Sequence, residues 1–526
     1  MTGIARLPHG NVGYLFAEHV ARTPDKAALV DFVGGGRRSR TYRQLEDRVS
    51  RVAGALQSSG VGPAQRIAIA TSNRLEFVEA FLGALRIGAT PVPINVKLAQ
   101  AQIESVVADA GCAGAIFDRE AGAHVEAALA SSGLGLTWSV GGEGESAYET
   151  QLARSDGRYA AFSPPERHPA IQMYTSGSTG TPKGVVLGHE GTAWFVEAAR
   201  TADPSTMNAD ASVLLAAPLF HKNALTGGIK MMLYAGGCAV ILQRFEPREF
   251  LRLLAAEACT YTSCVPAMLA MLIKERELVE TLDLSHLRLV LVGSAPCPES
   301  LIEQAEEILG CVVAQGYGLT EGGPVVLAQP DDLSAYGVAR APRGSCGVPL
   351  PGCEVDLVSD GEHGLQKGEL WVRNPGVAIE YANAPQTNAE KFSDGWLKTG
   401  DVFERDEKGF YFFRGRTDDM FHCGGENVFP LEVENILISH PDVVAVSVVP
   451  VDHGVKGQAP VAMVVARSGA SLSQEALQAY FFENGPAYAH PRRVFFVDEL
   501  PLSGAGKIDR KAVARQVADL IGPGAL

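Results

Sequence analysis

The sequence predicts a layered α/β protein with a large N-terminal domain and a small α+β C-terminal domain. Amphipathic helices alternate with short apolar strands through most of the chain, which is typical of helices packed on sheets. After Gly352, short strands follow one another between Gly, Asp and Pro residues, and this pattern predicts an antiparallel β layer. With 526 residues the chain is too long for one small module.

In the N-terminal part, the elements are predicted from the spacing of apolar side chains. Residues 42–58 form the clearest helix, because Leu45, Val49, Val52 and Leu56 recur every three or four positions. Strands and helices then alternate along the chain. The predicted strands are 67–70, 90–94, 237–242, 261–265 and 287–292, and the predicted helices are 76–87, 247–256 and 266–274.

The C-terminal part has a different pattern. Its predicted β layer contains strands at 354–358, 369–373 and 409–414. A compact tail follows Arg416, with predicted helices at 431–439 and 474–482 and predicted strands at 443–449 and 461–465. We therefore expect one domain of residues 1–417, a second domain of residues 418–526 and a boundary at Asp418.

Composition and charge disfavour several kinds of function. Asp and Glu outnumber Lys and Arg by 60 to 45, so the formal net charge of −15 gives no overall attraction to nucleic acid or anionic membranes. The nine cysteines include no C-x-x-C pair, which favours a reducing, cytoplasmic compartment. Arg86, Pro91 and Pro93 interrupt the apolar stretch at 80–94, so no membrane span is expected.

The strongest local signal is the segment from Tyr174 to Gly184, which reads YTSGSTGTPKG. Glycines let backbone N–H groups approach an anion, hydroxyls donate hydrogen bonds, and a lysine adds positive charge. The segment therefore favours triphosphate binding over a solvated Ser/Gly linker. It is not a Walker A loop, because Pro182 precedes Lys183 and a glycine follows it. The candidate phosphate ligands are Thr175, Ser176, Gly177, Ser178, Thr179, Gly180 and Lys183.

Further motifs follow this segment in order. They are Gln315-Gly316-Tyr317-Gly318-Leu319-Thr320-Glu321, Lys398-Thr399-Gly400-Asp401, Arg414-Gly415-Arg416-Thr417-Asp418-Asp419, Gly424-Gly425-Glu426-Asn427 and the segment from Pro501 to Ile508, which contains Lys507. With these motifs the sequence resembles the adenylate-forming (ANL) superfamily over nearly its whole length. That superfamily includes acyl-CoA synthetases, adenylation domains of peptide synthetases and firefly-type luciferases. The resemblance implies an acyl-adenylating enzyme with a mobile C-terminal domain.

The resemblance assigns nucleotide-binding roles to residues whose chemistry suits them. Tyr317 offers an aromatic face for adenine, Thr320 a hydroxyl for the α-phosphate, and Glu321 an oxygen ligand for Mg²⁺. Asp401 can accept hydrogen bonds from both ribose hydroxyls, and Arg416 faces ribose and phosphate. Without the motifs, a lone Tyr, Asp or Arg is more typical of a core aromatic, a turn or a surface ion pair. The expected ATP contacts also include Gly293, Ser294, Ala295, Pro296, Gly316 and Gly318.

The resemblance also assigns functions to the C-terminal domain. Lys507 corresponds to the catalytic lysine, whose ammonium neutralises charge on the attacking carboxylate and the α-phosphate. Asp418 corresponds to the hinge about which the domain rotates after adenylation. The rotation brings the CoA-binding face to the active site, formed here by Gly424, Gly425 and Glu426. Cys423 stands where serine is commoner, and the sequence leaves open whether its thiol is reactive.

The acyl pocket is expected around Phe220 and His221. Superfamily members that activate α-amino acids carry an aspartate just after this aromatic residue, but His221 and Lys222 follow Phe220 here. Because a buried ammonium without a partner is costly, a plain carboxylic acid is favoured. His221 resembles the gate residue of acyl- and aryl-CoA ligases, although a structural histidine is the alternative. The other expected pocket residues are Gly228, Gly316 and Gly323.

The sequence therefore predicts an ATP-dependent carboxylic acid–CoA ligase that uses Mg²⁺. An aryl, arylalkenoic or short-to-medium-chain monocarboxylic acid is expected to be activated as acyl-AMP and transferred to coenzyme A. The expected partners are small molecules, namely the acid, ATP and CoA, and a homodimer is left open. The alternatives are an enzyme that loads a separate carrier protein, an adenylate-forming oxygenase and, in another class, a non-catalytic nucleotide-binding regulator. Because Glu321, Asp401, Arg416 and Lys507 are all present, the regulator is disfavoured.

Overall fold

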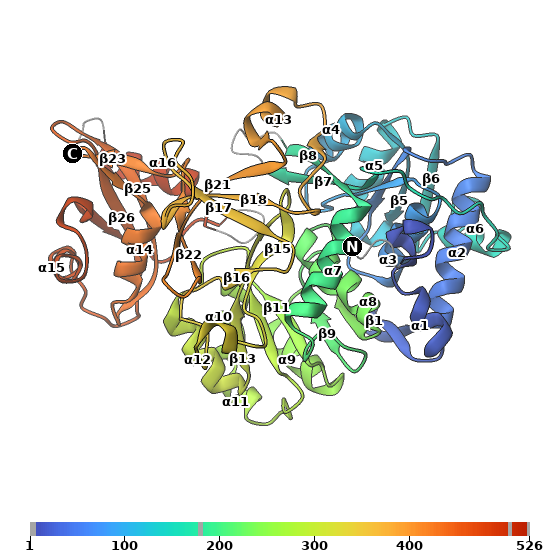
Figure 1. Cartoon of the computed structure of the whole chain (residues 1–526), viewed down its shortest axis with the longest axis horizontal. Coiled ribbons are helices and arrows are strands. Elements are labelled where there is room, and N and C mark those ends of the chain that lie inside the picture. The colour runs from blue at the N-terminus through green and yellow to red at the C-terminus, as the bar shows by residue number, and fades with distance from the viewer. Residues whose placement is uncertain (1–6, 177–181, 503–507, 523–526) are drawn as a thin grey trace.

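The computed structural model describes residues 7–176, 182–502 and 508–522. Its larger part is built on two mainly parallel sheets with helices around them, and the C-terminal part lies at one end of the molecule (Figure 1). This arrangement confirms the layered α/β fold that the sequence predicts. Within the described ranges, no helix is both long and apolar enough to cross a membrane.

The first sheet has four parallel strands in the order β4-β3-β5-β6. They are β3 (Arg66–Ala70), β4 (Thr90–Pro93), β5 (Cys112–Asp118) and β6 (Leu136–Val140). The helices of this region are α2 (Tyr42–Ser58), α3 (Leu75–Arg86), α4 (Gln100–Ala110), α5 (Ala123–Ser131) and α6 (Tyr148–Arg154). Helix α2 begins at a capping box, in which Thr41 and Gln44 each accept a hydrogen bond from the other's backbone N–H. Its predicted apolar stripe is buried.

The second sheet has seven strands in the order β13-β12-β11-β9-β10-β1-β2. They are β1 (Ala27–Val33), β2 (Gly36–Thr41), β9 (Ser212–Leu215), β10 (Cys238–Leu242), β11 (Tyr261–Cys264), β12 (Leu289–Val292) and β13 (Val312–Gln315). Every neighbouring pair is parallel except β1 with β2. The accompanying helices are α1 (Ala17–Arg22), α7 (His189–Ala202), α8 (Met231–Ala235), α9 (Pro247–Ala256), α10 (Pro266–Ile273), α11 (Arg276–Val279) and α12 (Glu299–Leu309). A π-helix, η5 (Asn223–Lys230), runs directly into α8.

Three antiparallel sheets complete the larger part, including the β layer predicted after Gly352. One contains β7 (Pro169–Ser176), β8 (Pro182–Gly188) and β19 (Glu380–Tyr381), and a second contains β14 (Tyr317–Leu319), β15 (Gly323–Ala328) and β16 (Val348–Pro349). The third contains β17 (Glu354–Val358), β18 (Lys367–Arg373), β20 (Phe392–Ser393), β21 (Trp396–Arg405) and β22 (Tyr411–Arg416). Helix α13 (Pro385–Lys391) lies between β19 and β20 in the chain.

The C-terminal part has its own mixed sheet and its own core. Its strands are β23 (Phe421–Cys423), β24 (Glu426–Val428), β25 (Val443–His453), β26 (Gly457–Ala466) and β27 (Arg493–Phe496). Its helices are α14 (Pro430–Ile438), α15 (Gln474–Asn484) and α16 (Arg510–Ile521). Leu437, Val448 and Phe481 are fully buried at its centre. The position predicted for the domain boundary, Asp418, lies between β22 and β23.

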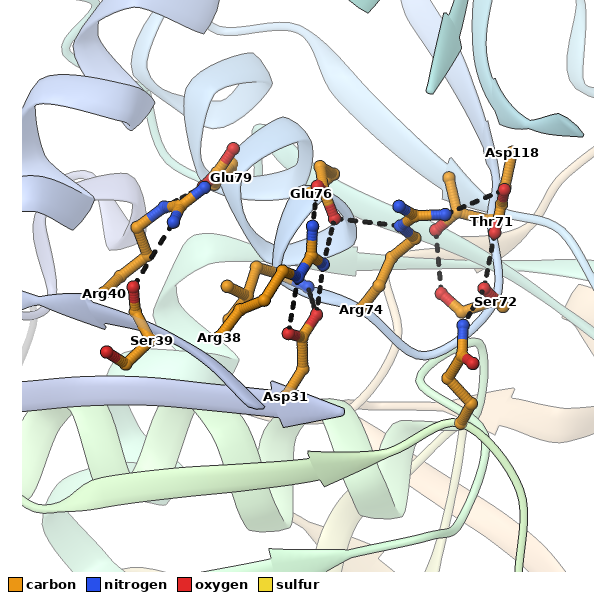
Figure 2. Close-up of polar contacts among 12 residues, drawn as sticks. Asp31, Arg38, Ser39, Arg40, Thr71, Ser72, Arg74, Glu76, Glu79 and Asp118 are labelled. Carbon is orange, nitrogen blue, oxygen red and sulfur yellow. Dashed lines mark hydrogen bonds and ion pairs between the residues drawn. The ribbon is translucent and has the colours of Figure 1, made fainter. Parts of the chain in front are cut away.

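A network of buried charges joins the two parallel sheets of the larger part (Figure 2). Arg38 of β2 binds Asp31 with Nε at 2.9 Å and Glu76 with Nη1 at 2.8 Å. Arg74 binds the same Glu76 with Nε at 2.9 Å, and its Nη1 lies 2.8 Å from Asp118 Oδ1 at the end of β5. Burial alone would raise the pKa of Glu76, but Arg38 and Arg74 outweigh it and hold that pKa at about 2.

We expect the stability contribution of Glu76 to disappear in acid. At neutral pH, Glu76→Gln should destabilise the protein by about 3–5 kcal/mol, because the buried guanidinium of Arg74 and the half-buried one of Arg38 lose their shared carboxylate. Since the folded pKa lies below the ordinary 4.5, the stabilisation is complete above pH 4.5 and is lost as the pH falls towards 2. Urea unfolding of both proteins across this range measures the difference, and a difference that does not change with pH would contradict the assignment. Glu145→Gln is the control, because Glu145 pairs with Arg154 on the surface.

Candidate active site

The site lies at the carboxyl ends of β12 and β13, two neighbouring parallel strands of the seven-stranded sheet. Gly293 follows β12 and donates its N–H to Cys264 O at 3.2 Å, and Gly316 follows β13 and donates to Val292 O at 3.1 Å. A Cβ on Gly293 would lie 3.7 Å from Gly316 O, so the two loops run side by side. Ser294 adopts a φ of 66°, which is uncommon for a residue other than glycine. Small residues at the carboxyl end of a parallel sheet are typical of a ligand site.

Three of the residues predicted to bind the nucleotide are in contact here. Tyr317 and Arg416 both bind Asp401. Asp401 of β21 pairs in register with Arg416 of β22. Tyr317 Oη donates to Asp401 Oδ2 at 2.5 Å, and Arg416 Nη1 donates to Asp401 Oδ1 at 2.7 Å. Burial raises the pKa of Asp401, although Arg416 and the Tyr317 hydroxyl act in the opposite direction. The structure therefore holds a buried carboxylate in place with one donor on each oxygen.

The Tyr317 ring belongs to an aromatic group as well. Its centroid lies 4.7 Å from that of Phe403 in an edge-on arrangement and 6.5 Å from that of Phe413, nearly parallel. Tyr317 is nevertheless only half-buried, so part of the residue remains accessible. Tyr317 can therefore be a core aromatic residue and still offer its ring to adenine, because packing against Phe403 fixes the orientation of the ring.

The Thr320–Glu321 turn is held by donors from distant parts of the chain. Lys222 Nζ donates to Thr320 O at 2.6 Å, and the Ala378 N–H donates to Glu321 O at 2.7 Å. Tyr381 Oη donates to Glu321 Oε1 at 2.9 Å, and burial together with Glu321 raises the pKa of the Tyr381 hydroxyl. No group of three or more His, Cys, Asp or Glu side chains that could hold a metal occurs among the described residues. A single carboxylate of this kind suits Mg²⁺ that is bound largely by phosphates.

The predicted phosphate-binding segment includes the end of β7 and the start of β8, which pair antiparallel. Thr175 pairs with Lys183 in the register, and Ser176 ends β7. Lys183 Nζ donates to Thr387 Oγ1 of α13 at 3.0 Å. The predicted ligands Gly177, Ser178, Thr179 and Gly180 lie outside the described residues.

A cavity of about 980 Å³ adjoins the site. Its apolar wall comes from the π-helix, from α7 and α8 and from strands β11, β12, β13 and β15. The apolar lining residues include Phe195, Gly227, Met231, Tyr261, Leu291 and Val325. Strand β13 lines this cavity, and the chain continues from it at Gly316 into the segment predicted to bind the nucleotide. The volume is ample for a bulky apolar tail.

The predicted pocket residues lie close to this cavity rather than on its wall. A Cβ on Gly228 would lie 2.5 Å from Leu215 Cδ1, and a Cβ on Gly323 would lie 3.4 Å from Trp194 Cζ3. Neither glycine lines the cavity, whereas Gly227 does. Gly316 faces the cavity-lining Leu291, whose Cδ1 would lie 3.4 Å from a Cβ at that position.

The predicted gate residues, Phe220 and His221, are not among the residues that line the cavity. Phe220 is half-buried and His221 is exposed, and their ring centroids lie 4.7 Å apart. Asn73 fixes the approach to this pair, because its Oδ1 accepts from Leu219 N at 2.8 Å and its Nδ2 donates to Ala217 O at 2.9 Å. The gate segment is therefore anchored to the first parallel sheet.

Charged residues that line the cavity could not be found from the sequence. Asp203, Arg288, Glu299 and Arg343 line it and come from four separate segments. Burial and the neighbouring carboxylate of Asp331 raise the pKa of Asp203 to about 6. No spacing in the sequence links these positions, because only the fold brings them together. The lining therefore combines charged and apolar side chains.

The C-terminal residues occupy turns. Gly424 and Gly425, with φ of 65° and 92°, form the two-residue turn of an exposed hairpin in which Cys423 pairs with Glu426. Cys423 itself is buried, and its thiol lies 3.3 Å from Tyr488 O. Lys507 lies outside the described residues.

The chain is similar to known enzymes over most of its length. Residues 16–382 match the model of the family described as AMP-binding enzyme, and residues 432–507 match the AMP-binding enzyme C-terminal domain. The chain is 33% identical to an indoleacetate–CoA ligase of Aromatoleum aromaticum, over 91% of this chain and 94% of that protein. It is 30% identical to the long-chain-fatty-acid–CoA ligase FadD13 of Mycobacterium tuberculosis, over 96% of this chain and 98% of that protein.

A solved structure is similar over nearly the whole chain. It is the anthranilate CoA ligase AuaEII in complex with anthranoyl-AMP, with a TM-score of 0.87 and 25% identity. The match covers 98% of this chain and 99% of that one.

Proposed function

The chain belongs to the family of AMP-binding enzymes and is an AMP-forming acid–CoA ligase, and we propose that its acid is a monocarboxylic acid with an apolar or aromatic tail. The proposed reaction has two steps. The carboxylate attacks the α-phosphate of ATP to give acyl-AMP and pyrophosphate, and the thiol of CoA then displaces AMP to give the thioester. The observation that carries the proposal is the continuity of residues 312–321, whose strand lines the cavity and whose loop reaches Asp401.

For the first step, the described residues supply binding and orientation. The two oxygens of Asp401 suit the ribose hydroxyls, and Tyr317 presents its ring beside them. Thr320 and Glu321 face the phosphates in this proposal, and bound Mg²⁺ supplies charge neutralisation for the triphosphate. Lys507 neutralises charge on the carboxylate and the α-phosphate as they approach.

For the second step, the C-terminal domain has to present a different face. We place the hinge at Asp418, in the short connection between β22 and β23. Arg416 Nη2 lies 3.7 Å from Asp418 Oδ2 across this connection, and both side chains are partly exposed. A contact of this kind is worth about 0–1 kcal/mol, so it does not lock the domain. The exposed Gly424–Gly425 turn is the proposed CoA face.

The cavity supports an apolar tail but leaves its length open. Its lining includes apolar side chains such as Phe195, Met231 and Leu291 as well as charged ones. The related ligases are named for indoleacetate, a long-chain fatty acid and anthranilate, so both aromatic and aliphatic acids occur among them. An amino acid is disfavoured as substrate, because Lys222 and not a carboxylate follows the gate residues.

We expect several related acids to react when a panel of carboxylic acids is assayed with ATP, Mg²⁺ and CoA. Acids that differ by one methylene should differ by about 10–200-fold in kcat/KM, since an apolar pocket discriminates weakly. α-Amino acids should be the poorest substrates. Acid-dependent exchange of labelled pyrophosphate into ATP, AMP release and thioester formation are read together. AMP release without thioester would favour the carrier-protein alternative, and no exchange with any acid would favour the regulator.

Narrowing the cavity provides the matched variant for this panel. A Cβ on Gly227 would meet only Asn223 Oδ1, at 3.2 Å, so Gly227→Val adds volume at the wall without a severe collision. In Gly227→Val, the order of kcat/KM among the acids should shift in favour of acids with smaller tails. An unchanged ranking would show that the tail does not lie against this wall.

A further inference from the structure

Lys222 is a buried cation that joins the acyl segment to the nucleotide-binding turn. It follows His221 and immediately precedes the π-helix Asn223–Lys230. Its side chain is almost enclosed, since the residue is 8% exposed. Its Nζ donates to the carbonyl oxygen of Thr320 at 2.6 Å. Burial lowers the pKa of Lys222 to about 7, while the nearby Glu321 raises it.

The two carbonyls that follow Thr320 are held from another direction. The Ala378 N–H donates to Glu321 O at 2.7 Å, and Asn374 Nδ2 donates to Gly322 O at 2.9 Å. Both donors belong to the segment after β18. The turn is therefore clamped on one side by neutral donors from that segment and on the other side by the ammonium of Lys222.

A second buried lysine shows that burial alone does not explain this contact. Lys230, at the other end of the π-helix, is 1% exposed, and burial lowers its pKa to about 7 as well. Its Nζ lies 3.4 Å from Thr192 Oγ1 and 4.7 Å from the centroid of the Phe81 ring. Lys230 thus points into the core between helices, whereas Lys222 points at the turn that carries Thr320 and Glu321.

Burying an ammonium costs several kcal/mol unless its hydrogen bonds to the protein offset the lost hydration. A leucine or methionine could fill the volume beside the gate at lower cost. The unfavourable burial of the Lys222 ammonium is explained if its hydrogen bond to the Thr320 carbonyl has a function. Holding that peptide fixes the direction of the Thr320 and Glu321 side chains, and a displacement of about 1 Å in such groups costs roughly 10²-fold in rate.

We propose that Lys222 is a positioning residue for adenylation, which sets the Thr320–Glu321 turn for the triphosphate and ties it to the acyl segment. The inference rests on the proposed function, because it assigns Lys222 to the first of the two half-reactions. Lys222 acts through Thr320 and Glu321 and does not take part in bond formation. The second half-reaction, in which the triphosphate has already left, does not need this arrangement.

The test compares Lys222→Met with the wild-type enzyme in the two half-reactions separately. Pyrophosphate exchange reports adenylation, and thioester formation from supplied acyl-AMP reports thiolation. We expect exchange to fall by about 10²-fold, mainly in kcat, with thiolation reduced by no more than a few-fold. Lys222→Arg keeps a charged donor and should recover part of the exchange activity.

Lys230→Met is the matched control, since Lys230 is equally buried and does not contact the turn. Any loss it causes should affect both half-reactions in the same proportion. An equal loss of both half-reactions in Lys222→Met, or no loss, would overturn the proposal. If Lys222→Met does not fold, as judged by circular dichroism, the same split is read from Lys222→Gln and Lys222→Arg, and equal activity of these two variants would overturn it. A wild-type protein that performs neither half-reaction would instead refute the proposed function.

Discussion

Lys507→Ala is expected to slow formation of acyl-AMP by about 10²–10³-fold, because one preorganised cation is removed from the site where two anions meet. Thiolation of supplied acyl-AMP should remain within a few-fold of the wild-type rate, since that step uses the Gly424–Gly425 face in the proposed mechanism. The described residues before and after Lys507 are anchored. Leu502 and Ile508 form an antiparallel bridge, and Arg510 Nη2 binds Glu434 at 2.6 Å. The substitution should therefore leave the fold of the domain intact.

The measurement is the same pair of half-reactions, with Lys408→Ala as the control. Lys408 is an exposed lysine of the larger part, so its removal tests for a general effect of lost positive charge. Equal loss of adenylation and thiolation in Lys507→Ala would contradict the rotation of the C-terminal domain. Full adenylation in this variant would contradict the identification of Lys507 itself.

Local patterns predicted individual elements well. The helix predicted at 42–58 is α2 with the same bounds, because its apolar stripe and its capping box both lie within or next to the segment. The strand predicted at 409–414 is shifted and runs from Tyr411 to Arg416. Gly409 has a φ of 90° and belongs to the turn, while the strand extends so that Arg416 pairs with Asp401. Such a shift depends on a partner strand and not on the segment alone.

Long-range arrangement could not be predicted in the same way. The parallel pairing of β1 with β10 joins segments more than 200 residues apart, and the alternation of apolar residues contains no information about it. The π-helix at Asn223–Lys230 and the charged residues that line the cavity could not be predicted from local patterns either. The motifs named Tyr317, Asp401 and Arg416 separately, but only the fold shows that Tyr317 and Arg416 both donate to the carboxylate of Asp401.

Asp401→Asn is expected to weaken AMP binding by about 10²-fold or more. Asparagine keeps the shape of the side chain but offers one acceptor oxygen, and it removes the negative charge. Each hydrogen bond to a charged group is worth about 1.5–3 kcal/mol, and 1.36 kcal/mol corresponds to tenfold in affinity, so one or two lost ribose contacts account for the effect. The contact with Arg416 at 2.7 Å is weakened as well. Calorimetric titration with AMP measures this change without dependence on catalysis.

Two further variants determine whether the effect belongs to the carboxylate at this position. Tyr317→Phe removes the 2.5 Å hydrogen bond but leaves Asp401 charged, so its loss of affinity should be smaller than that of Asp401→Asn. Glu404→Gln changes another carboxylate of β21, which binds Arg414 at 3.0 Å away from this group, and should leave AMP affinity unchanged. If Asp401→Asn bound AMP as tightly as the wild-type protein, the nucleotide would have to lie elsewhere. If Asp401 binds the ribose, the loss of AMP affinity should be largest for Asp401→Asn, which removes the acceptor. It should be smaller for Tyr317→Phe, which removes a hydrogen bond to that acceptor, and absent for Glu404→Gln, which changes an unrelated charge.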